Sequence, residues 1–261
     1  MNTIVIAVIS LSCIGFVCAA VITVASKLMF VKIDVRVEKL CDCLPGANCG
    51  ACGFSSCEGY AQALAKGDVA SNLCLPAGEA GLSKINDILG ISSGEGIAKM
   101  TAYVQCLGDY NATKIKMEYV GIQTCFAAKQ LYGGQWACTY GCMGYGDCVR
   151  VCPSDAICIE NNLARIDPRK CSGCAVCVKV CPTDVIRVEK EPVYVAIMCK
   201  NTEKGAQVKE KCSKGCIGCM RCVKECPTKT ITAGENLAIL DHIICDGCRK
   251  CVEVCIVKCI V

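Results

Sequence analysis

The sequence predicts an α+β protein that combines an N-terminal transmembrane helix, a small α-rich domain and two tandem cysteine-rich units. Three observations lead to this fold class. The first is an uncharged apolar run over residues 3–26, and the second is an isolated group of four cysteines over residues 49–74. The third is a set of nine cysteines, beginning at Cys125, that recur 74 residues further along the chain. A constant offset of this kind indicates a duplicated structural unit.

The composition favours metal sites over disulfides. The chain has 30 cysteines among 261 residues, and only 5% of the residues are aromatic. Repeated C-x2-C-x2-C spacing is typical of metal sites, whereas secreted disulfide frameworks rarely repeat it. The net charge of +4 gives no indication of nucleic-acid binding. The sequence has no dinucleotide or P-loop motif, and His242 does not follow a C-x2-C pair as in c-type haem attachment.

The apolar run predicts a membrane anchor over residues 1–30. Residues 3–26 carry no charge and are long enough to cross a bilayer as a helix. Basic residues follow the run and none precedes it, which by the positive-inside rule places the rest of the chain in the cytoplasm. These basic residues are Lys27, Lys32, Arg36 and Lys39. A cleaved signal peptide is the alternative, but the basic n-region is missing and the run is long. We therefore expect a single-pass protein of the cell membrane with its metal sites on the cytoplasmic side.

Residues 31–80 form the predicted α-rich domain. Its four candidate metal ligands are Cys49, Cys52, Cys57 and Cys74. Gly50 and Gly53 let the loop turn tightly and leave N–H groups free to point at sulfur. A short helix over residues 58–70 would return the chain to this loop. Four thiolates fit either an iron–sulfur cluster or a structural zinc, and the spacing alone leaves both open.

A region with few cysteines, residues 81–124, is expected to act as a linker or packing region. Its helical pattern places four apolar residues on one face, which predicts packing rather than binding. They are Leu82, Ile85, Ile88 and Leu89. Cys106 lies in "TAYVQCLGD", an apolar stretch that fits a strand. A single cysteine in such a place is more often a buried thiol than a ligand.

The first cysteine group carries a family resemblance. The segments "CGACGFSSCEGYAQAL" and "CLPAGEAGLSKINDILG" resemble the B component of the ion-translocating Rnf complex, also called the electron transport complex. In that family these four cysteines hold a [4Fe–4S] cluster, and a hydrophobic N-terminal helix precedes them. The resemblance covers nearly the whole chain.

The duplicated units, residues 125–198 and 199–261, each resemble a two-cluster bacterial-type 2[4Fe–4S] ferredoxin. The ferredoxin run is C-x2-C-x2-C-x3-C-P. Between the runs, "AICIENNLARID" and "TITAGENLAIL" predict a strand, a turn and a second strand. Ile256 stands where proline usually follows the last cysteine, but proline binds no metal, so this change casts little doubt on the site.

One loop, "ACTYGCMGYGDCVRVCP" over residues 137–153, departs from the ferredoxin run. Tyr145 occupies the position that Cys219 has in the second unit, so the first unit lacks one standard ligand. Cys138 and Cys125 are both placed to replace it, and Cys138 is preferred because it lies on the same loop. The Rnf family resembles the sequence here too, with a C-x-Y-G-C-x-G-x-G-D-C pattern. The site is therefore expected to be rewired rather than lost.

Crossed pairing assigns the remaining ligands, because the fourth cysteine of each ferredoxin run ligates the other cluster. With the N-terminal set, this predicts five [4Fe–4S] clusters and no catalytic residue. The four sets in the repeats are Cys138, Cys142, Cys148 and Cys181; Cys152, Cys171, Cys174 and Cys177; Cys216, Cys219, Cys222 and Cys255; and Cys226, Cys245, Cys248 and Cys251.

Ten cysteines have no assigned ligand role: Cys13, Cys18, Cys41, Cys43, Cys106, Cys125, Cys158, Cys199, Cys212 and Cys259. Buried thiols that pack the loops are the simpler explanation, since free cysteine is commonly buried. A further cluster or metal that uses some of them, with Cys106 among the candidates, is the alternative.

Clusters with four cysteines each leave no iron open to a substrate, which favours electron transfer. The resemblance implies that electrons pass from reduced ferredoxin, through the repeats and then the Cys49–Cys74 cluster, to membrane subunits. Those subunits would pump Na+ or H+ while reducing NAD+ or another carrier. The alternatives are a polyferredoxin subunit of another redox enzyme, such as a hydrogenase, and a structural zinc-thiolate protein.

Basic residues in the second unit are expected to meet an acidic ferredoxin, because complementary charge mainly raises the encounter rate. A solvated basic surface is the alternative explanation. The residues are Lys204, Lys209, Lys211, Lys214, Arg221, Lys224, Lys229, Arg249, Lys250 and Lys258.

Overall fold

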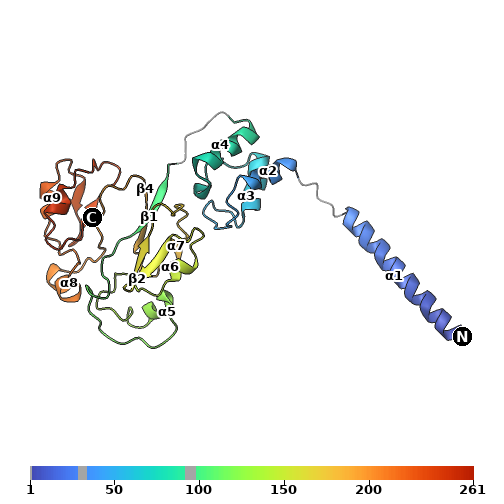
Figure 1. Cartoon of the computed structure of the whole chain (residues 1–261), viewed down its shortest axis with the longest axis horizontal. Helices are drawn as coiled ribbons and strands as arrows, with labels where there is room; N and C mark the ends of the chain where they lie inside the picture. The colour runs from blue at the N-terminus through green and yellow to red at the C-terminus, as the bar shows by residue number, and fades with distance from the viewer. Residues whose placement is uncertain (1, 29–33, 92–97) are drawn as a thin grey trace.

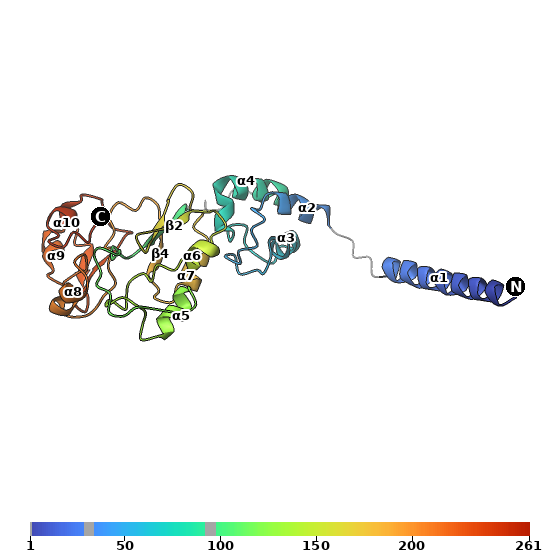
Figure 2. The same cartoon turned by 60° about the horizontal axis from the view of Figure 1, so that its bottom comes forward.

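The computed structural model describes residues 2–28, 34–91 and 98–261. Within them the helix α1, a small helical domain and two ferredoxin-like units follow one another in chain order (Figures 1 and 2). The tandem organisation expected from the cysteine spacing is therefore visible in three dimensions.

Helix α1 (Asn2–Leu28) covers the uncharged run. No helix in the described part of the chain is long and apolar enough to cross a membrane. The predicted transmembrane helix over residues 1–30 is therefore wrong as part of the fold class, and Lys32 of its basic flank lies outside the described residues.

The small helical domain packs its helices around the first cysteine loop. Its elements are α2 (Val35–Asp42), α3 (Cys57–Lys66), the short 3-10 helix η1 (Leu75–Ala77) and α4 (Gly78–Leu89). Helix α3 begins where the Ser56 hydroxyl accepts a hydrogen bond from Gly59 N–H at 3.0 Å. It ends at Gly67, whose φ of 79° is left-handed and favours glycine. The helix expected over residues 58–70 is thus confirmed but shorter.

Helix α4 belongs to this domain rather than to a linker. Leu82 and Ile85 are buried, and Ile85 joins Leu40, Tyr60 and Leu64 in one core. The predicted packing face is therefore confirmed. The region over residues 81–124 is divided between two domains, because α4 packs in the small helical domain and β1 pairs with β4 of the first ferredoxin-like unit.

The first ferredoxin-like unit consists of short helices and two antiparallel strand pairs. Its elements are β1 (Met100–Val104), α5 (Cys125–Gln130), α6 (Asp147–Arg150), β2 (Ile157–Glu160), β3 (Leu163–Ile166), α7 (Val176–Val180) and β4 (Ile186–Lys190). Strands β2 and β3 form the expected hairpin, with Ile157 opposite Ile166. Strand β1 pairs antiparallel with β4, so that Val104 lies opposite Ile186. The strand before Cys106 is thereby confirmed and belongs to this unit.

The second unit repeats this plan. Its elements are α8 (Gly205–Lys211), α9 (Arg221–Glu225), β5 (Ile231–Ala233), β6 (Ala238–Leu240) and α10 (Lys250–Glu253). Strands β5 and β6 form the second expected hairpin, with Ile231 opposite Leu240. A bridge between Ile197 and Ile260 replaces the longer β1–β4 pair of the first unit.

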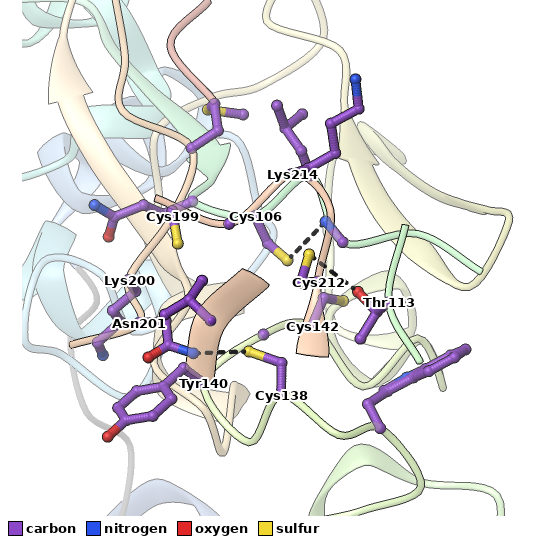
Figure 3. A pocket seen from close by; sticks show the side chains of 18 residues that line it. Cys106, Thr113, Cys138, Tyr140, Cys142, Cys199, Lys200, Asn201, Cys212 and Lys214 are labelled. Carbon is purple, nitrogen blue, oxygen red and sulfur yellow. Dashed lines mark hydrogen bonds between the residues drawn. The ribbon is translucent and has the colours of Figure 1, made fainter. Parts of the chain in front are cut away.

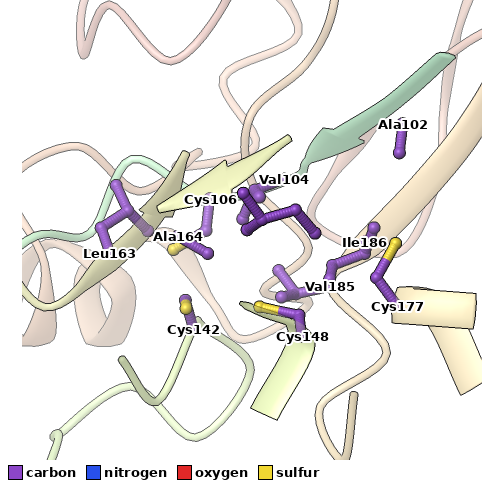
Figure 4. Packing of buried hydrophobic residues seen from close by; sticks show 11 residues of the cluster. Ala102, Val104, Cys106, Cys142, Cys148, Leu163, Ala164, Cys177, Val185 and Ile186 are labelled. Atoms are coloured by element: carbon purple, nitrogen blue, oxygen red, sulfur yellow. The ribbon is translucent and has the colours of Figure 1, made fainter. Parts of the chain in front are cut away.

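Cysteines form part of the core in both units. In the first unit, Cys142, Cys148 and Cys177 are buried among aliphatic residues that include Leu163 and Ile186 (Figure 4). The second unit buries Cys216, Cys222 and Cys251 in the same manner. Because these cores are small and poor in aromatics, the cysteines lie where a single-domain protein would place large apolar side chains.

Several contacts join the two units. Lys114 N–H donates to Lys211 O at 2.9 Å, and Ser213 N–H donates to Ala112 O at 2.9 Å. The Lys200 ammonium donates to Asp184 O at 2.8 Å. These bonds bring the segment before α5 against the loop that follows α8, and they define the junction between the units.

Candidate iron–sulfur sites

The N-terminal set of cysteines converges as expected. Cys49, Cys52 and Cys57 lie close enough to Cys74 for their charges to act on its thiol. Cys57 begins α3, and its N–H donates to Asn48 Oδ1 at 2.8 Å, which holds the loop against the helix. The four sulfurs therefore come from the loop, the helix start and the returning segment.

Cys74 is the buried member of this set. The Tyr60 hydroxyl donates to Ala70 O at 2.9 Å and ties the returning segment to α3. Burial, with the charge of Cys52 as a smaller cause, raises the pKa of the Cys74 thiol to about 11. A bound metal cation reverses this preference, because a coordinating thiol is deprotonated outright. The site thus disfavours four thiolates in the absence of a metal and favours them when metal cations are bound.

The inner set of the first unit also converges. Its members are Cys152, Cys171, Cys174 and Cys177. Burial first, and then the nearby Cys174 and Cys171, raise the pKa of the Cys177 thiol to about 12. Backbone N–H groups point at the sulfurs: Ala102 donates to Cys171 Sγ at 3.4 Å, and Ala156 donates to Cys152 Sγ at 3.4 Å. Such N–H···S bonds tune the reduction potential of a cluster.

The second unit contains the two remaining regular sets. In one, Cys222 lies near Cys216, Cys219 and Cys255, and burial raises its pKa to about 11. Cys259, which has no ligand role in the crossed pairing, donates its N–H to Cys255 Sγ at 3.4 Å.

In the other regular set, Cys251 lies near Cys245 and Cys248, and burial raises its pKa. Cys226 packs against the same core that buries Cys251. The structure thus brings members of both predicted sets close together, while the crossed pairing itself stays a prediction.

At the irregular loop, the structure brings Cys125 rather than Cys138 next to the other three predicted ligands. Cys125, Cys142, Cys148 and Cys181 line one pocket, whereas Cys138 does not line it. Cys125 begins α5, where the Thr124 hydroxyl accepts from Ala127 N–H at 3.1 Å. The Phe126 N–H donates to Asp147 Oδ2 at 3.1 Å, which ties α5 to α6.

Tyr145 stays beside the set that Cys125 completes. Its ring packs edge-on against Tyr119, with the ring centroids 5.6 Å apart. Burial, then Tyr119 and Cys125, raise the pKa of its phenol. The structure thus brings Cys125, the alternative candidate, close to Cys142, Cys148 and Cys181, and the fourth ligand of this set stays a prediction.

Cys138 lies instead in a pocket at the junction of the two units (Figure 3). Five cysteines line this pocket: Cys106, Cys138, Cys142, Cys199 and Cys212. Three of them have no place in the crossed pairing. Burial raises the pKa of Cys106 to about 12 and that of Cys199 to about 12. In the sequence, these cysteines of the junction pocket are indicated only by the isolated Cys106 and by Cys138 and Cys212, which occupy equivalent positions of the repeat.

The described cysteines are not drawn together around a single metal ion. Among the residues that the structure describes, no group of three or more His, Cys, Asp or Glu side chains could hold one.

Taken together, the repeated runs, the two hairpins and the convergent cysteines define an iron–sulfur protein with tandem ferredoxin-like units. The comparisons with known proteins agree. The FeS family model, described as an Fe-S cluster, matches residues 44–76. The Fer4 model, a 4Fe-4S binding domain, matches residues 164–187 and 214–232.

Three relatives match most of the chain. The B component of the proton-translocating ferredoxin:NAD(+) oxidoreductase complex of Clostridium ljungdahlii is 39% identical over 94% of this chain and 87% of its own length. The Na(+)-translocating counterpart of Acetobacterium woodii is 36% identical over 93% of this chain and 73% of its own length. The B component of the ion-translocating oxidoreductase complex of Methanosarcina acetivorans is 32% identical over 87% of this chain and 86% of its own length. The chain belongs to the family formed by the B components of these ion-translocating oxidoreductase complexes.

Proposed function

We propose that this chain relays electrons within an ion-translocating ferredoxin:NAD+ oxidoreductase complex and accepts them from a reduced ferredoxin. Its family and its five predicted cysteine sets support this role. Bound [4Fe–4S] clusters would supply one-electron transfer, so that each step oxidises the donor by one electron and breaks no bond. The chain's own residues hold those clusters, bury them and aim N–H groups at their sulfurs. If Cys125 replaces Cys138 as a ligand, each of the five sets still contains four cysteines, and the crossed pairing of the other ligands is unchanged.

The observation that supports electron entry at the second unit is the exposure of two of its cysteines. Cys219 and Cys248 are exposed, whereas Cys174, the counterpart of Cys248 in the first unit, is buried. Beside Cys174, strand β1 comes so close that a side chain at Gly173 would collide with Met100. Beside Cys248, Tyr194 takes the equivalent place and a side chain at Gly247 would collide with its ring, yet Cys248 stays exposed to a donor.

Basic side chains surround these exposed cysteines. Arg221 and Lys224 on α9 and Arg249 and Lys250 at α10 are all exposed. Arg221 and Lys224 also line a surface pocket that reaches Cys255 and includes Glu225 and Glu253. An acidic ferredoxin that docks here would approach both sets of the second unit, and opposite charge would raise its encounter rate.

Charge reversal tests this docking surface. We expect Arg221→Glu with Lys224→Glu to slow reduction of the chain by ferredoxin at low salt about 10-fold or more, because the donor then meets like charge. The same variant should lose most of this difference at high ionic strength, where surface charges are screened. Stopped-flow absorption measures both rates.

A matched double reversal, Lys66→Glu with Lys84→Glu, changes the net charge equally on exposed residues of the small helical domain. At 0.1 M salt it should leave the ferredoxin rate within about 2-fold of the unchanged chain, since screening there limits charge effects to about 10 Å. Equal slowing by both pairs would replace local docking with a net-charge effect.

The complex to which the chain belongs is proposed to work at the cell membrane, because ion translocation requires one. The cluster domains are placed on its cytoplasmic side, where reducing conditions keep so many thiols free. The relatives are named for either proton or Na+ translocation, so the coupling ion is not part of the proposal. Other subunits of the complex would receive electrons from the N-terminal set.

A further inference from the structure

We propose that Cys106, Cys138, Cys199 and Cys212 hold a sixth [4Fe–4S] cluster at the junction between the two ferredoxin-like units. None of these residues belongs to a ferredoxin run, and the family models place no site here. The proposal rests on the arrangement of the four sulfurs and their donors. It does not depend on which donor reduces the chain.

The four sulfurs come together around Cys106. Cys106 lies near Cys138 and Cys199. A side chain added at Gly108 would lie 3.4 Å from Cys106 Sγ and 3.5 Å from Cys212 Sγ, so both sulfurs approach the same point. Figure 3 shows these four cysteines around one pocket, which Cys142 also lines.

The pocket is built symmetrically from the two units. Cys138 and Cys212 are equivalent residues, since they are 74 positions apart. Cys106 and Cys199 are equivalent by strand pairing. Gln105 N–H donates to Val185 O at 2.7 Å, and Met198 N–H donates to Cys259 O at 2.7 Å. Val185 and Cys259 are again 74 positions apart, so each unit contributes one cysteine after its first strand and one from its loop.

Hydrogen-bond donors are aimed at these sulfurs, as at the regular sets. Gly108 N–H donates to Cys106 Sγ at 3.3 Å, and the Thr113 hydroxyl donates to Cys212 Sγ at 3.5 Å. The Asn201 side-chain amide donates to Cys138 Sγ at 3.6 Å. Asn201 is only 1% exposed, and buried amides of this kind are placed where a polar partner must be satisfied.

Space at the pocket is kept by glycines. A side chain at Gly108 would collide with the Thr113 hydroxyl and contact the sulfurs of Cys106 and Cys212. A side chain at Gly141 would lie 3.3 Å from Cys106 Sγ and 3.8 Å from Cys138 Sγ. Two glycines therefore leave the volume next to the sulfurs free. Four thiols that only packed the junction would not require that space.

A cluster here would link the two units directly. Cys142 of the irregular set lines the same pocket, and its N–H faces Cys106 Sγ. On the other side, the Cys216 N–H faces Cys199 Sγ. The site therefore lies between the set that contains Cys142 and the set that contains Cys216. A cluster there would be an intermediate redox centre for electrons that cross the junction.

The test is the iron and acid-labile sulfide content of the full chain purified without oxygen. We expect about 24 iron atoms per chain, at four per cubane cluster. The double variant Cys138→Ser with Cys199→Ser should contain about 20. The control Cys158→Ser, which changes an exposed cysteine outside every set, should keep the full content.

The iron content of the unchanged chain tests the sixth cluster even if the double variant does not fold. About 20 iron atoms in the unchanged chain, at four per cluster, would overturn the proposal. So would about 20 iron atoms with one zinc that the double variant loses, because a single ion would then occupy the junction. A colourless protein without iron would instead reject the electron-relay function as a whole.

Discussion

Serine at position 125 is expected to remove one cluster from the first unit. Cys125→Ser should contain about four fewer iron atoms than the unchanged chain, at four per cubane. The reason is that Cys125 completes the pocket formed by Cys142, Cys148 and Cys181. Iron analysis measures the loss, and EPR of the reduced protein shows which signal disappears.

Cysteine at position 145 should rescue this variant. Cys142, Tyr145 and Cys148 have the spacing of the regular run, and Tyr145 lies beside Cys125 in the structure. Tyr145→Cys combined with Cys125→Ser therefore restores C-x2-C-x2-C and should recover the missing iron. The same rescue should fail with Cys138→Ser, because Cys138 belongs to the junction pocket. Rescue of Cys138→Ser but not of Cys125→Ser would reverse the two assignments.

The second large effect is expected at the N-terminal set. Cys74→Ser should lose about four iron atoms, at four per cubane, and should abolish NAD+ reduction by the assembled complex. The reason is that this set is the proposed exit from the relay. The isolated variant should still be reduced by ferredoxin at the rate of the unchanged chain, because entry takes place at the other end.

Cys43→Ser is the matched control for this position. Cys43 lies in the same domain but outside the set, and its thiol donates to Lys39 O at 3.2 Å. It should keep both the iron and the activity of the complex. NAD+ reduction that persists in the complex with Cys74→Ser would show that electrons leave the chain elsewhere.

The repeated parts of the fold could be predicted from the sequence because each is specified locally. Turn residues between alternating apolar residues predicted both hairpins, and β2–β3 and β5–β6 confirm them. The N-terminal set and the three regular runs converge for the same reason, since each run aims its sulfurs within a few residues. Cys74 returns because α3 has the length that the spacing requires.

The junction could not be predicted because it depends on contacts between distant segments. Cys125 and Cys199 share the offset of 74 residues, yet they lie in different pockets. The true counterpart of Cys199 is Cys106, which precedes the repeat and joins it only through the pairing of β1 with β4. Proximity along the loop favoured Cys138 at the irregular set, whereas in the structure Cys138 lines the junction pocket.

The transmembrane prediction is wrong for a different reason. It rested on the uncharged run and its basic flank, which are properties of composition. No helix in the residues that the structure describes has the length and apolar character that crossing requires. Helix formation over this run is nevertheless confirmed, since α1 extends over Asn2–Leu28.

The most direct test of the electron relay is rapid mixing of the oxidised chain with reduced ferredoxin in the absence of oxygen. The relay predicts that the visible absorption of the clusters bleaches, that one electron is taken up for each ferredoxin oxidised, and that the rate falls as salt is added. Full iron content without bleaching would contradict the account, because the clusters would then be present but closed to this donor.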